Sequence, residues 1–303
     1  MFYHHDIDNF LVALDQKTGK IVWRTPRKGF TRSYSTPIIA KFGGRTEVIV
    51  AGSLQLAGYE TSSGKKLWWV NQLSRIVDPT PNLVDGVVYI ASQTAGGDAT
   101  ERISMGPFSN ALVDFDKNGN GAVEKNELPA NSPVVPRFFR MDLDQNKKLD
   151  SEEWEKHAGV FERAQNVAIA VRLGGEGDVT QTHISWTQKR SLPTVPSSVV
   201  YEDIMYMVKD SGIISSIDAK TGELLQQGRA IGRGNYYASL IAGDGKIYLA
   251  SERGVVTVLK AGRKWTVLAD HDFGARILAT PVGAENRLYV RTDEALYCFG
   301  KAN

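Results

Sequence analysis

The chain has 303 residues, of which 42% are hydrophobic and 23% are charged, and its formal net charge is +2. This composition is typical of a soluble globular protein, and so small a net charge gives no reason to expect a nucleic-acid partner. The single cysteine, Cys298, excludes an intrachain disulfide, and no apolar run approaches the roughly 20 residues of a transmembrane helix.

The N-terminal segment, MFYHHDIDNFLVALD, has no charged region followed by an apolar one, so it is not a signal peptide. It leads into a repeated motif: residues 11–23 read LVALDQKTGKIVW, residues 56–68 read LAGYETSSGKKLW, and residues 214–226 read ISSIDAKTGELLQ. Each copy alternates apolar and polar positions and then reads D/E-x-x-T/S-G. The acidic and hydroxyl side chains of this turn can bond nearby backbone N–H groups, and the glycine supplies a positive φ.

A second repeated element precedes each copy and consists of a small residue and a proline, a short strand, a turn and another strand. Four tyrosines hold the same place in that second strand: Tyr89, Tyr206, Tyr248 and Tyr289. The last three are about 41–42 residues apart, which is close to the four-strand unit of a propeller blade. Trp23, Trp68 and Trp265 are then expected on outer strands, where a large ring packs against the adjacent blade.

The segment ALDQKTGKIVW follows the pattern A-x-D-x-x-T-G-x-x-x-W, which resembles the repeat of the pyrroloquinoline quinone (PQQ)-like β-propellers. That family includes the quinoprotein alcohol dehydrogenases and the outer-membrane assembly lipoprotein of bacteria, which is a scaffold. The resemblance covers nearly the whole chain outside residues 95–165. It implies an all-β fold of four-stranded antiparallel blades, and it leaves the activity open because the family contains both enzymes and non-enzymes.

Five to six repeats are recognisable, but residues 1–24 supply only the later strands of one unit and residues 279–300 only the earlier ones. Either the two ends complement each other in one blade of a five-bladed ring, or the chain starts in mid-blade and is part of a seven- or eight-bladed propeller. We expect the second arrangement. The predicted domains are propeller blades in residues 1–94, an inserted segment in 95–165, and further blades in 166–303.

Residues 116–127 of the inserted segment read DKNGNGAVEKNE and match the EF-hand pattern D-x-[DN]-x-[DN]-G-x5-E. A hard cation such as Ca²⁺ needs six to eight oxygen ligands, and this pattern supplies them in order. The predicted ligands are Asp116, Asn118, Asn120, Ala122 through its carbonyl, Glu124 and Glu127. Gly121 makes the sharp turn, and Val123 takes the apolar eighth position.

Residues 142–153 read DLDQNKKLDSEE and repeat the pattern. The predicted ligands are Asp142, Asp144, Asn146, Lys148 through its carbonyl, Asp150 and Glu153. Lys147 stands where a glycine is usual, and a positive φ costs such a residue about 1 kcal/mol or more. We therefore expect the second loop to bind more weakly than the first, although it has more carboxylates.

The sequence around the loops predicts helix–loop–helix units. Residues 107–115 and 136–141 are expected to enter the two loops as helices, and residues 151–165 to leave the second loop with an apolar stripe. Pro129 is expected to cut short the helix that leaves the first loop. Val123 and Leu149 are expected to pair as a short β-bridge between the loops.

A search for catalytic motifs finds no H-E-x-x-H, G-x-S-x-G, P-loop or C-x-x-C pattern, and GGEGD at 174–178 reads as a turn. By the family resemblance, a quinoprotein dehydrogenase would have a vicinal disulfide and a calcium site near the propeller axis. A lone Cys298 cannot form that disulfide, and the calcium-type residues lie in the insertion. We therefore predict no catalytic residue and no residue that binds an organic cofactor, and PQQ is not expected.

The sequence favours a non-catalytic, calcium-binding propeller with one or two ions, acting as a scaffold for interactions. Its partner would be another protein or an extracellular ligand on a propeller face. The expected compartment is the periplasm, the cell surface or the exterior, where millimolar calcium keeps weak loops filled. The alternative is a PQQ-dependent oxidoreductase or a degenerate relative, so enzyme status stays open. A carbohydrate- or polymer-binding propeller is a third option, for which the sequence offers no specific residue.

Overall fold

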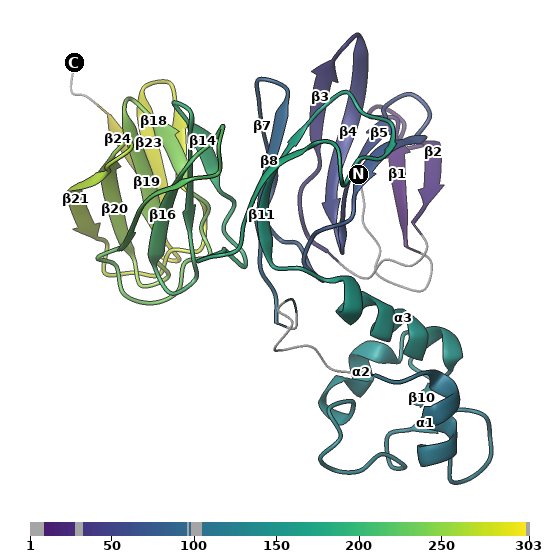
Figure 1. The fold of residues 1–303 in the computed structure, drawn as a ribbon. Helices are drawn as coiled ribbons and strands as arrows, with labels where there is room; N and C mark the ends of the chain where they lie inside the picture. The colour runs from purple at the N-terminus through teal and green to yellow at the C-terminus, as the bar shows by residue number, and fades with distance from the viewer. Residues whose placement is uncertain (1–8, 28–32, 96, 98–104, 301–303) are drawn as a thin grey trace.

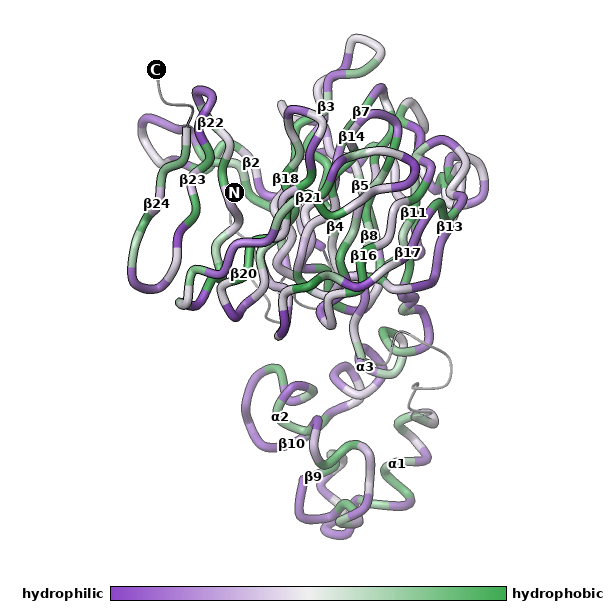
Figure 2. Tube along the Cα trace, turned by 90° about the vertical axis from the view of Figure 1, so that its left-hand side faces the viewer, coloured by the Kyte–Doolittle hydropathy of each residue, from purple (hydrophilic) through white to green (hydrophobic). Residues whose placement is uncertain are grey.

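The computed structural model describes residues 9–27, 33–95, 97 and 105–300. Its strands form a series of antiparallel sheets, and a small helical segment projects from one end of them (Figure 1). Hydrophobic residues concentrate in the strands, whereas the connecting turns are mostly hydrophilic (Figure 2). The predicted all-β architecture of four-stranded blades with a helical insertion is confirmed.

The first sheet contains only strands that precede the helical segment, whereas the second and third sheets contain strands from both sides of it. The first sheet pairs β1 (Phe10–Leu14) with β2 (Ile21–Pro26). The second has the order β12-β6-β5-β4-β3, with strands β3 (Ile38–Phe42), β4 (Arg45–Gly52), β5 (Gln55–Glu60), β6 (Lys66–Val70) and β12 (Gly177–Asp178). The third has the order β13-β11-β8-β7, with strands β7 (Asn82–Val84), β8 (Val87–Ser92), β11 (Val167–Arg172) and β13 (Ile184–Gln188).

The last three sheets follow in simple chain order. The fourth contains β14 (Val199–Tyr201), β15 (Ile204–Val208), β16 (Ile213–Asp218) and β17 (Leu224–Arg229). The fifth contains β18 (Ile241–Gly243), β19 (Lys246–Ala250), β20 (Val255–Lys260) and β21 (Thr266–Asp272). The sixth contains β22 (Val282–Ala284), β23 (Arg287–Arg291) and β24 (Leu296–Gly300).

The partial sheets at the two ends of the chain do not join. Within the described residues, β1–β2 and β22–β24 are separate sheets. Both β1 and β24 hold the third-strand position of the repeat, so together they would supply that position twice. The five-bladed arrangement, in which the two ends complete one blade, is therefore not the one observed.

The repeated tyrosines occupy equivalent sites in their sheets. Each lies in the second strand of its blade and pairs with the first residue of the first strand. The pairs are Asn82 with Tyr89, Val199 with Tyr206, Ile241 with Tyr248, and Val282 with Tyr289. This register confirms the second repeated element of the sequence.

Two of the tryptophans lock one blade onto the next. Trp23 donates its indole N–H to the carbonyl of Thr61 at 2.9 Å, and its ring covers Gly64 in the D/E-x-x-T/S-G turn of the following blade. A Cβ atom on Gly64 would lie 2.4 Å from that ring. Trp186 makes the same contact with Gly222. The glycine of this turn is therefore required both by its positive φ and by the ring packed on it.

A second link between blades runs along the starts of their first strands. The backbone N–H of Thr80 donates to Ser197 Oγ at 2.9 Å, that of Ser197 to Ser239 Oγ at 3.0 Å, and that of Ser239 to Thr280 Oγ1 at 3.0 Å. Each hydroxyl thus satisfies a backbone donor of the preceding blade. The hydroxyl comes from the small residue at this step of the repeat, which a proline follows at Thr280 but not at Ser197 or Ser239.

The helical segment takes the place of a short hairpin turn between β8 and β11, which are antiparallel neighbours. Its elements are α1 (Phe108–Phe115), β9 (Val123–Glu124), η2 (Val135–Arg137), α2 (Phe138–Met141), β10 (Lys148–Leu149) and α3 (Ser151–Arg163). It has a hydrophobic core of its own, made of Phe108, Ala111, Val123, Leu128, Val134, Phe138, Met141, Leu149 and Trp154. In the part of the chain that the structure describes, no helix is long and apolar enough to cross a membrane.

Helix α3 connects this small core to the sheets. Near its C-terminal end, Val160 and Ala164 pack against Leu54, which lies in the β4–β5 turn with a φ of 65°. The backbone N–H of Gln165 then donates to the carbonyl of Leu73 at 3.0 Å, and the chain enters β11 at Val167. The helix that leaves the second predicted calcium loop is therefore fixed directly to the propeller.

Candidate metal centre

The two predicted calcium loops have the same pattern of backbone conformation. In loop 116–127, φ is 71° at Gly119 and 80° at Gly121, the fourth and sixth positions. In loop 142–153, φ is 58° at Gln145 and 70° at Lys147, the same two positions. The sixth position therefore takes a positive φ even where the residue is lysine, as the sequence predicted.

The eighth positions of the loops face each other. Strands β9 and β10 are antiparallel, with Leu149 paired to Val123 and Lys148 paired to Glu124. Val123 and Leu149 are both fully buried in the core of the insertion. The predicted β-bridge is present, and it places the two loops back to back.

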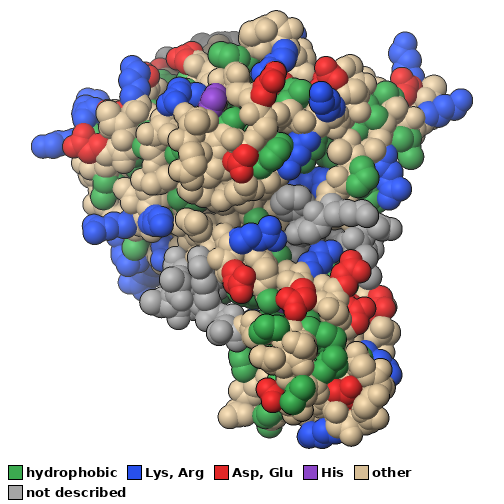
Figure 3. Space-filling view, turned by 45° about the vertical axis from the view of Figure 1, so that its right-hand side comes forward, with side chains coloured by type: hydrophobic (Ala, Val, Ile, Leu, Met, Phe, Trp, Pro, Cys, Tyr) green, Lys and Arg blue, Asp and Glu red, His purple; other side chains and the backbone are tan. Residues whose placement is uncertain are grey.

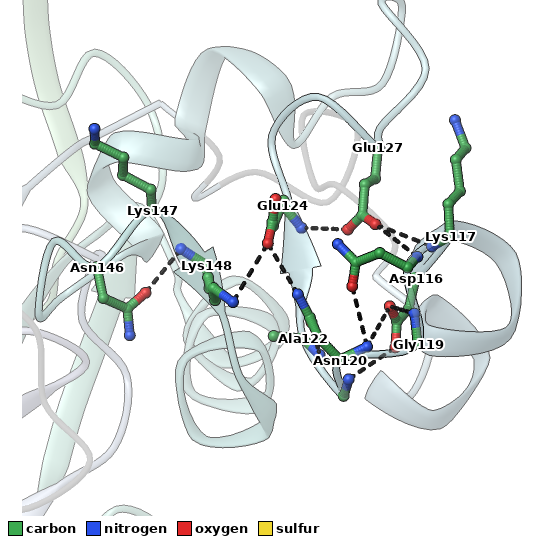
Figure 4. A network of polar contacts seen from close by, with 12 residues as sticks. Asp116, Lys117, Gly119, Asn120, Ala122, Glu124, Glu127, Asn146, Lys147 and Lys148 are labelled. Atoms are coloured by element: carbon green, nitrogen blue, oxygen red, sulfur yellow. Dashed lines mark hydrogen bonds and ion pairs between the residues drawn. The ribbon is translucent and has the colours of Figure 1, made fainter.

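The carboxylate of Asp116 organises the first loop (Figure 4). Its Oδ1 accepts the backbone N–H groups of Gly119 at 2.8 Å and Asn120 at 3.1 Å, and its Oδ2 accepts that of Gly121 at 2.9 Å. Asn118 Oδ1 accepts the N–H of Asn120 at 3.1 Å. These bonds fold the backbone around the first ligand position, as the EF-hand pattern requires.

The other end of the first loop is closed by Glu127, the twelfth position. Its Oε1 accepts the backbone N–H of Lys117 at 3.0 Å, and its Oε2 accepts that of Glu124 at 2.8 Å. The Glu124 side chain accepts from Asn120 Nδ2 at 2.9 Å and lies 3.4 Å from Lys148 Nζ. A lysine of the second loop thus partly neutralises a predicted ligand of the first.

Three carboxylates converge in the second loop. Asp142, Asp144 and Glu153 each offer an oxygen, and these oxygens lie within 4.8 Å of one another. Asp142 is only 8% exposed; its Oδ2 accepts the N–H of Lys147 at 2.9 Å, whereas its Oδ1 has no hydrogen-bond partner among the described residues. A buried carboxylate oxygen without a partner is costly, and a divalent cation is the ligand that would satisfy it and its two neighbours.

Glu153 serves both the loop and helix α3. Its Oε1 accepts the N–H groups of Leu143 and Asp144, and its Oε2 accepts the N–H of Asp150 at 3.3 Å. In return Asp150 Oδ1 accepts the N–H of Glu153 at 2.9 Å, which completes a capping box at the start of the helix. Burial raises the pKa of Glu153, and a bound cation would favour its ionised form.

The remaining predicted ligands take up supporting positions. Asn146 Oδ1 accepts the N–H of Lys148 at 2.7 Å, and Asn120 Oδ1 accepts that of Ala122 at 3.0 Å. Asp150 caps its own helix. Among the twelve predicted positions, the structure therefore brings Asp142, Asp144 and Glu153 together as a carboxylate cluster. The assignment of all twelve as ligands stays a prediction.

The sequence did not point to the anchor of this centre. Leu54 lies almost 100 residues before Glu153, in a turn whose sequence, GSLQ, reads like any other hairpin. Its contact with Val160 and Ala164 depends on where the third blade sits relative to the second. The only local signal was the apolar stripe of residues 151–165.

Comparison with a family model and with solved structures supports the propeller fold. Residues 2–115 match the family model described as outer membrane protein assembly factor BamB. BamB from Moraxella catarrhalis is structurally similar, with a TM-score of 0.54 and 12% identity over 97% of this chain and 70% of that one. Sqt1 from Saccharomyces cerevisiae has a TM-score of 0.55 and 10% identity over 100% of this chain and 69% of that one. No curated protein matches the sequence.

Proposed function

We propose that this PQQ-like repeat propeller is a non-catalytic scaffold for interactions, and that residues 95–165 form an inserted calcium-binding unit. The convergence of Asp142, Asp144 and Glu153, with a buried oxygen of Asp142 that no described residue bonds, is the observation that carries the calcium part. The likeness of residues 2–115 to an outer-membrane assembly factor supports the scaffold part.

The partner that fits a scaffold of this kind is another protein or an extracellular ligand bound on a face of the propeller. Propeller blades present their connecting loops at the two ends of the strands, where loops can vary without disturbing the sheets. The helical unit projects from one of these ends, beside the turns of the neighbouring blades (Figure 1). A bound ion would then hold the insertion of residues 95–165 rigid next to such a surface.

The proposed compartment is the periplasm or the cell surface. The matched family model is named for assembly at the outer membrane, which favours the same location for this chain. Calcium is millimolar outside the cytoplasm, so even loops of modest affinity would stay filled there. One or two ions are expected, one for each loop.

Calcium titration by calorimetry tests the calcium part. Glu127→Gln combined with Glu153→Gln removes the twelfth-position carboxylate from both loops and should abolish the heats of binding. Glu152→Gln combined with Glu162→Gln is a matched control, because it removes two exposed carboxylates from the same segment. Heats that are unchanged in the first variant, or lost equally in both, would contradict the ligand assignments.

The non-catalytic part of the proposal is tested separately. After incubation with PQQ and calcium, the purified protein should show no alcohol-dependent reduction of an electron-accepting dye. Reduction that depends on PQQ and alcohol would instead support the alternative drawn from the sequence, a PQQ-dependent oxidoreductase.

A further inference from the structure

Arginines from two parts of the fold lie near one aromatic ring where the insertion meets the propeller. The guanidinium of Arg75, in the connection between β6 and β7, lies 5.2 Å from the ring centroid of Phe161 on α3. The guanidinium of Arg137, in η2, lies 5.4 Å from the same centroid. Arg140 follows on α2. Lys and Arg side chains are visible at the waist between the sheets and the helical segment (Figure 3).

A buried histidine lies among these arginines. His157 is 8% exposed, its ring centroid is 4.7 Å from that of Phe161, and its Nε2 has no hydrogen-bond partner in the described part of the chain. Burial and the positive charges of Arg75, Arg137 and Arg140 lower the pKa of His157 to about 3. The imidazole is therefore neutral at ordinary pH and offers a polar nitrogen that the described residues leave unused. We call Arg75, Arg137, Arg140 and His157 the basic junction.

Two arginines of the basic junction, Arg137 and Arg140, belong to the insertion. Within the described part of the chain, neither Arg137 nor Arg140 forms an ion pair, and the charged hydrogen bond of Arg137 is to the carbonyl of Pro133 at 3.1 Å. Burial and the proximity of Arg140 lower the pKa of Arg137. The like charges of Arg137 and Arg140 repel one another, so these two side chains favour an anion beside them.

We propose that the basic junction binds a phosphate-type oxyanion, which bridges the propeller to the insertion. Each guanidinium carries five donors in a planar fork, so those of Arg137 and Arg140 alone offer more donors than the two oxygens of one carboxylate can use. A tetrahedral oxyanion has enough oxygens for several forks and for the N–H of a His157 tautomer. Arg75 belongs to the propeller and the other three residues to the insertion, so one anion would join the two parts.

This proposal is independent of calcium and is tested with inorganic phosphate. Calorimetry at constant ionic strength, with sodium chloride exchanged for sodium phosphate, should show saturable binding to the wild type. Arg137→Gln with Arg140→Gln should weaken binding at least tenfold. Arg287→Gln with Arg291→Gln is the matched control: it removes the same charge from exposed positions on β23 and should leave binding unchanged.

A second measurement reports on the site itself. Phosphate should raise the pKa of His157 in NMR titration, because an anion favours the imidazolium, and the shift should vanish in Arg137→Gln/Arg140→Gln. Equal loss of phosphate binding in both arginine pairs, or an unmoved His157, would overturn the proposal. Calcium binding by each variant confirms that the insertion remains folded.

A further experiment identifies whether the phosphate group comes from a lipid or from a soluble molecule. Cosedimentation with phosphatidylglycerol vesicles, and not with phosphatidylcholine vesicles, that is lost in Arg137→Gln/Arg140→Gln would identify a lipid headgroup. Binding of inorganic phosphate without cosedimentation would identify a soluble phosphate. Absence of both kinds of binding would refute the site.

Discussion

The two calcium-type loops reach the same geometry from different sequences. Loop 116–127 has glycine at both positions of positive φ, whereas loop 142–153 has Gln145 and Lys147 there. In both loops the first-position aspartate accepts the N–H of the sixth residue, at 2.9 Å in each. The hydrogen bonds of that carboxylate impose the turn, and the residue at the sixth position decides only how much the turn costs.

The loops differ more in the segments to which their C-terminal ends connect. After Glu127 the chain forms a turn and reaches Pro129, and no helix leaves this loop among the described residues. Glu153 instead lies in the first turn of α3, whose other end packs on Leu54 of the propeller. A cation in the second loop would therefore be coupled to the whole molecule, and a cation in the first loop mainly to the insertion.

The largest effect on calcium binding should come from replacing each of the two twelfth-position glutamates by glutamine in turn. Losing a direct ligand should weaken calcium binding in that loop by on the order of 100-fold, at least as much as losing a residue that only orients a ligand. Saturating calcium should stabilise the wild type by about 3 kcal/mol at 100 times Kd. We expect Glu153→Gln to abolish most of this gain in urea unfolding of the propeller and Glu127→Gln to retain most of it.

The control for this pair is calcium-free protein: each glutamine loses one acceptor of a backbone N–H there, so the calcium-dependent gain of each variant is measured against its own calcium-free value. If Glu127→Gln lost the calcium-dependent gain and Glu153→Gln kept it, the proposed coupling through α3 would be wrong.

The next effect concerns the anchored helix and depends on pH. His157 has a folded pKa of about 3 against an ordinary value of 6.5, so between these values the unfolded chain binds a proton that the folded chain does not. The contribution of neutral His157 to the free energy of unfolding is therefore fully present above pH 6.5. It falls as the pH drops, by up to about 1.4 kcal/mol per pH unit. The neighbouring charges that produce this are Arg75, Arg137 and Arg140.

This prediction is measured as the difference between variants, because carboxylates also titrate in acid. His157→Leu should flatten the loss of stability between pH 6.5 and 5.5 in urea unfolding without phosphate. His183→Gln, on the partly exposed β12–β13 connection, should keep the wild-type slope. Parallel slopes for wild type and His157→Leu would mean that His157 is protonated in the folded protein.

Much of this comparison could be predicted from the sequence because it is local. The spacing of Asp, Asn and Glu in residues 116–127 and 142–153 predicted the turns, the positive φ at Lys147 and the bridge of Val123 with Leu149. The repeated tyrosines likewise predicted the register of the blades. Each of these features depends on residues near one another in the chain or on the repeat itself.

The features that the sequence did not reveal depend on packing between distant segments. Residues 174–178 read as a turn, and Gly174 and Gly177 do have positive φ, but β12 at the end of this segment also pairs in parallel with β6 of the preceding blade. The contact of α3 with Leu54 arises in the same way. No spacing within one segment specifies such contacts, because they depend on how successive blades are placed.

The cost of the sixth position gives a smaller effect. Lys147→Gly should stabilise the calcium-free protein by about 1 kcal/mol, because glycine adopts a positive φ without the steric cost that a side chain carries. Gly121→Lys should destabilise it by a similar amount. Urea unfolding in a chelator measures both, and a destabilising Lys147→Gly would show that the lysine side chain contributes contacts that outweigh its backbone strain.

The smallest effect tests the contact between the loops. Lys148 Nζ lies 3.4 Å from Glu124 Oε1 at a partly exposed site, where an ion pair contributes less than about 1 kcal/mol. Lys148→Gln frees this carboxylate for a cation in the first loop, so calcium affinity there should rise about two- to threefold in titrations of Glu153→Gln protein. Lys125→Gln removes the same charge from an exposed neighbouring position and is the control. Equal gains in both variants would mean that the general positive charge of the segment, and not the ion pair with Glu124, limits the calcium affinity of the first loop.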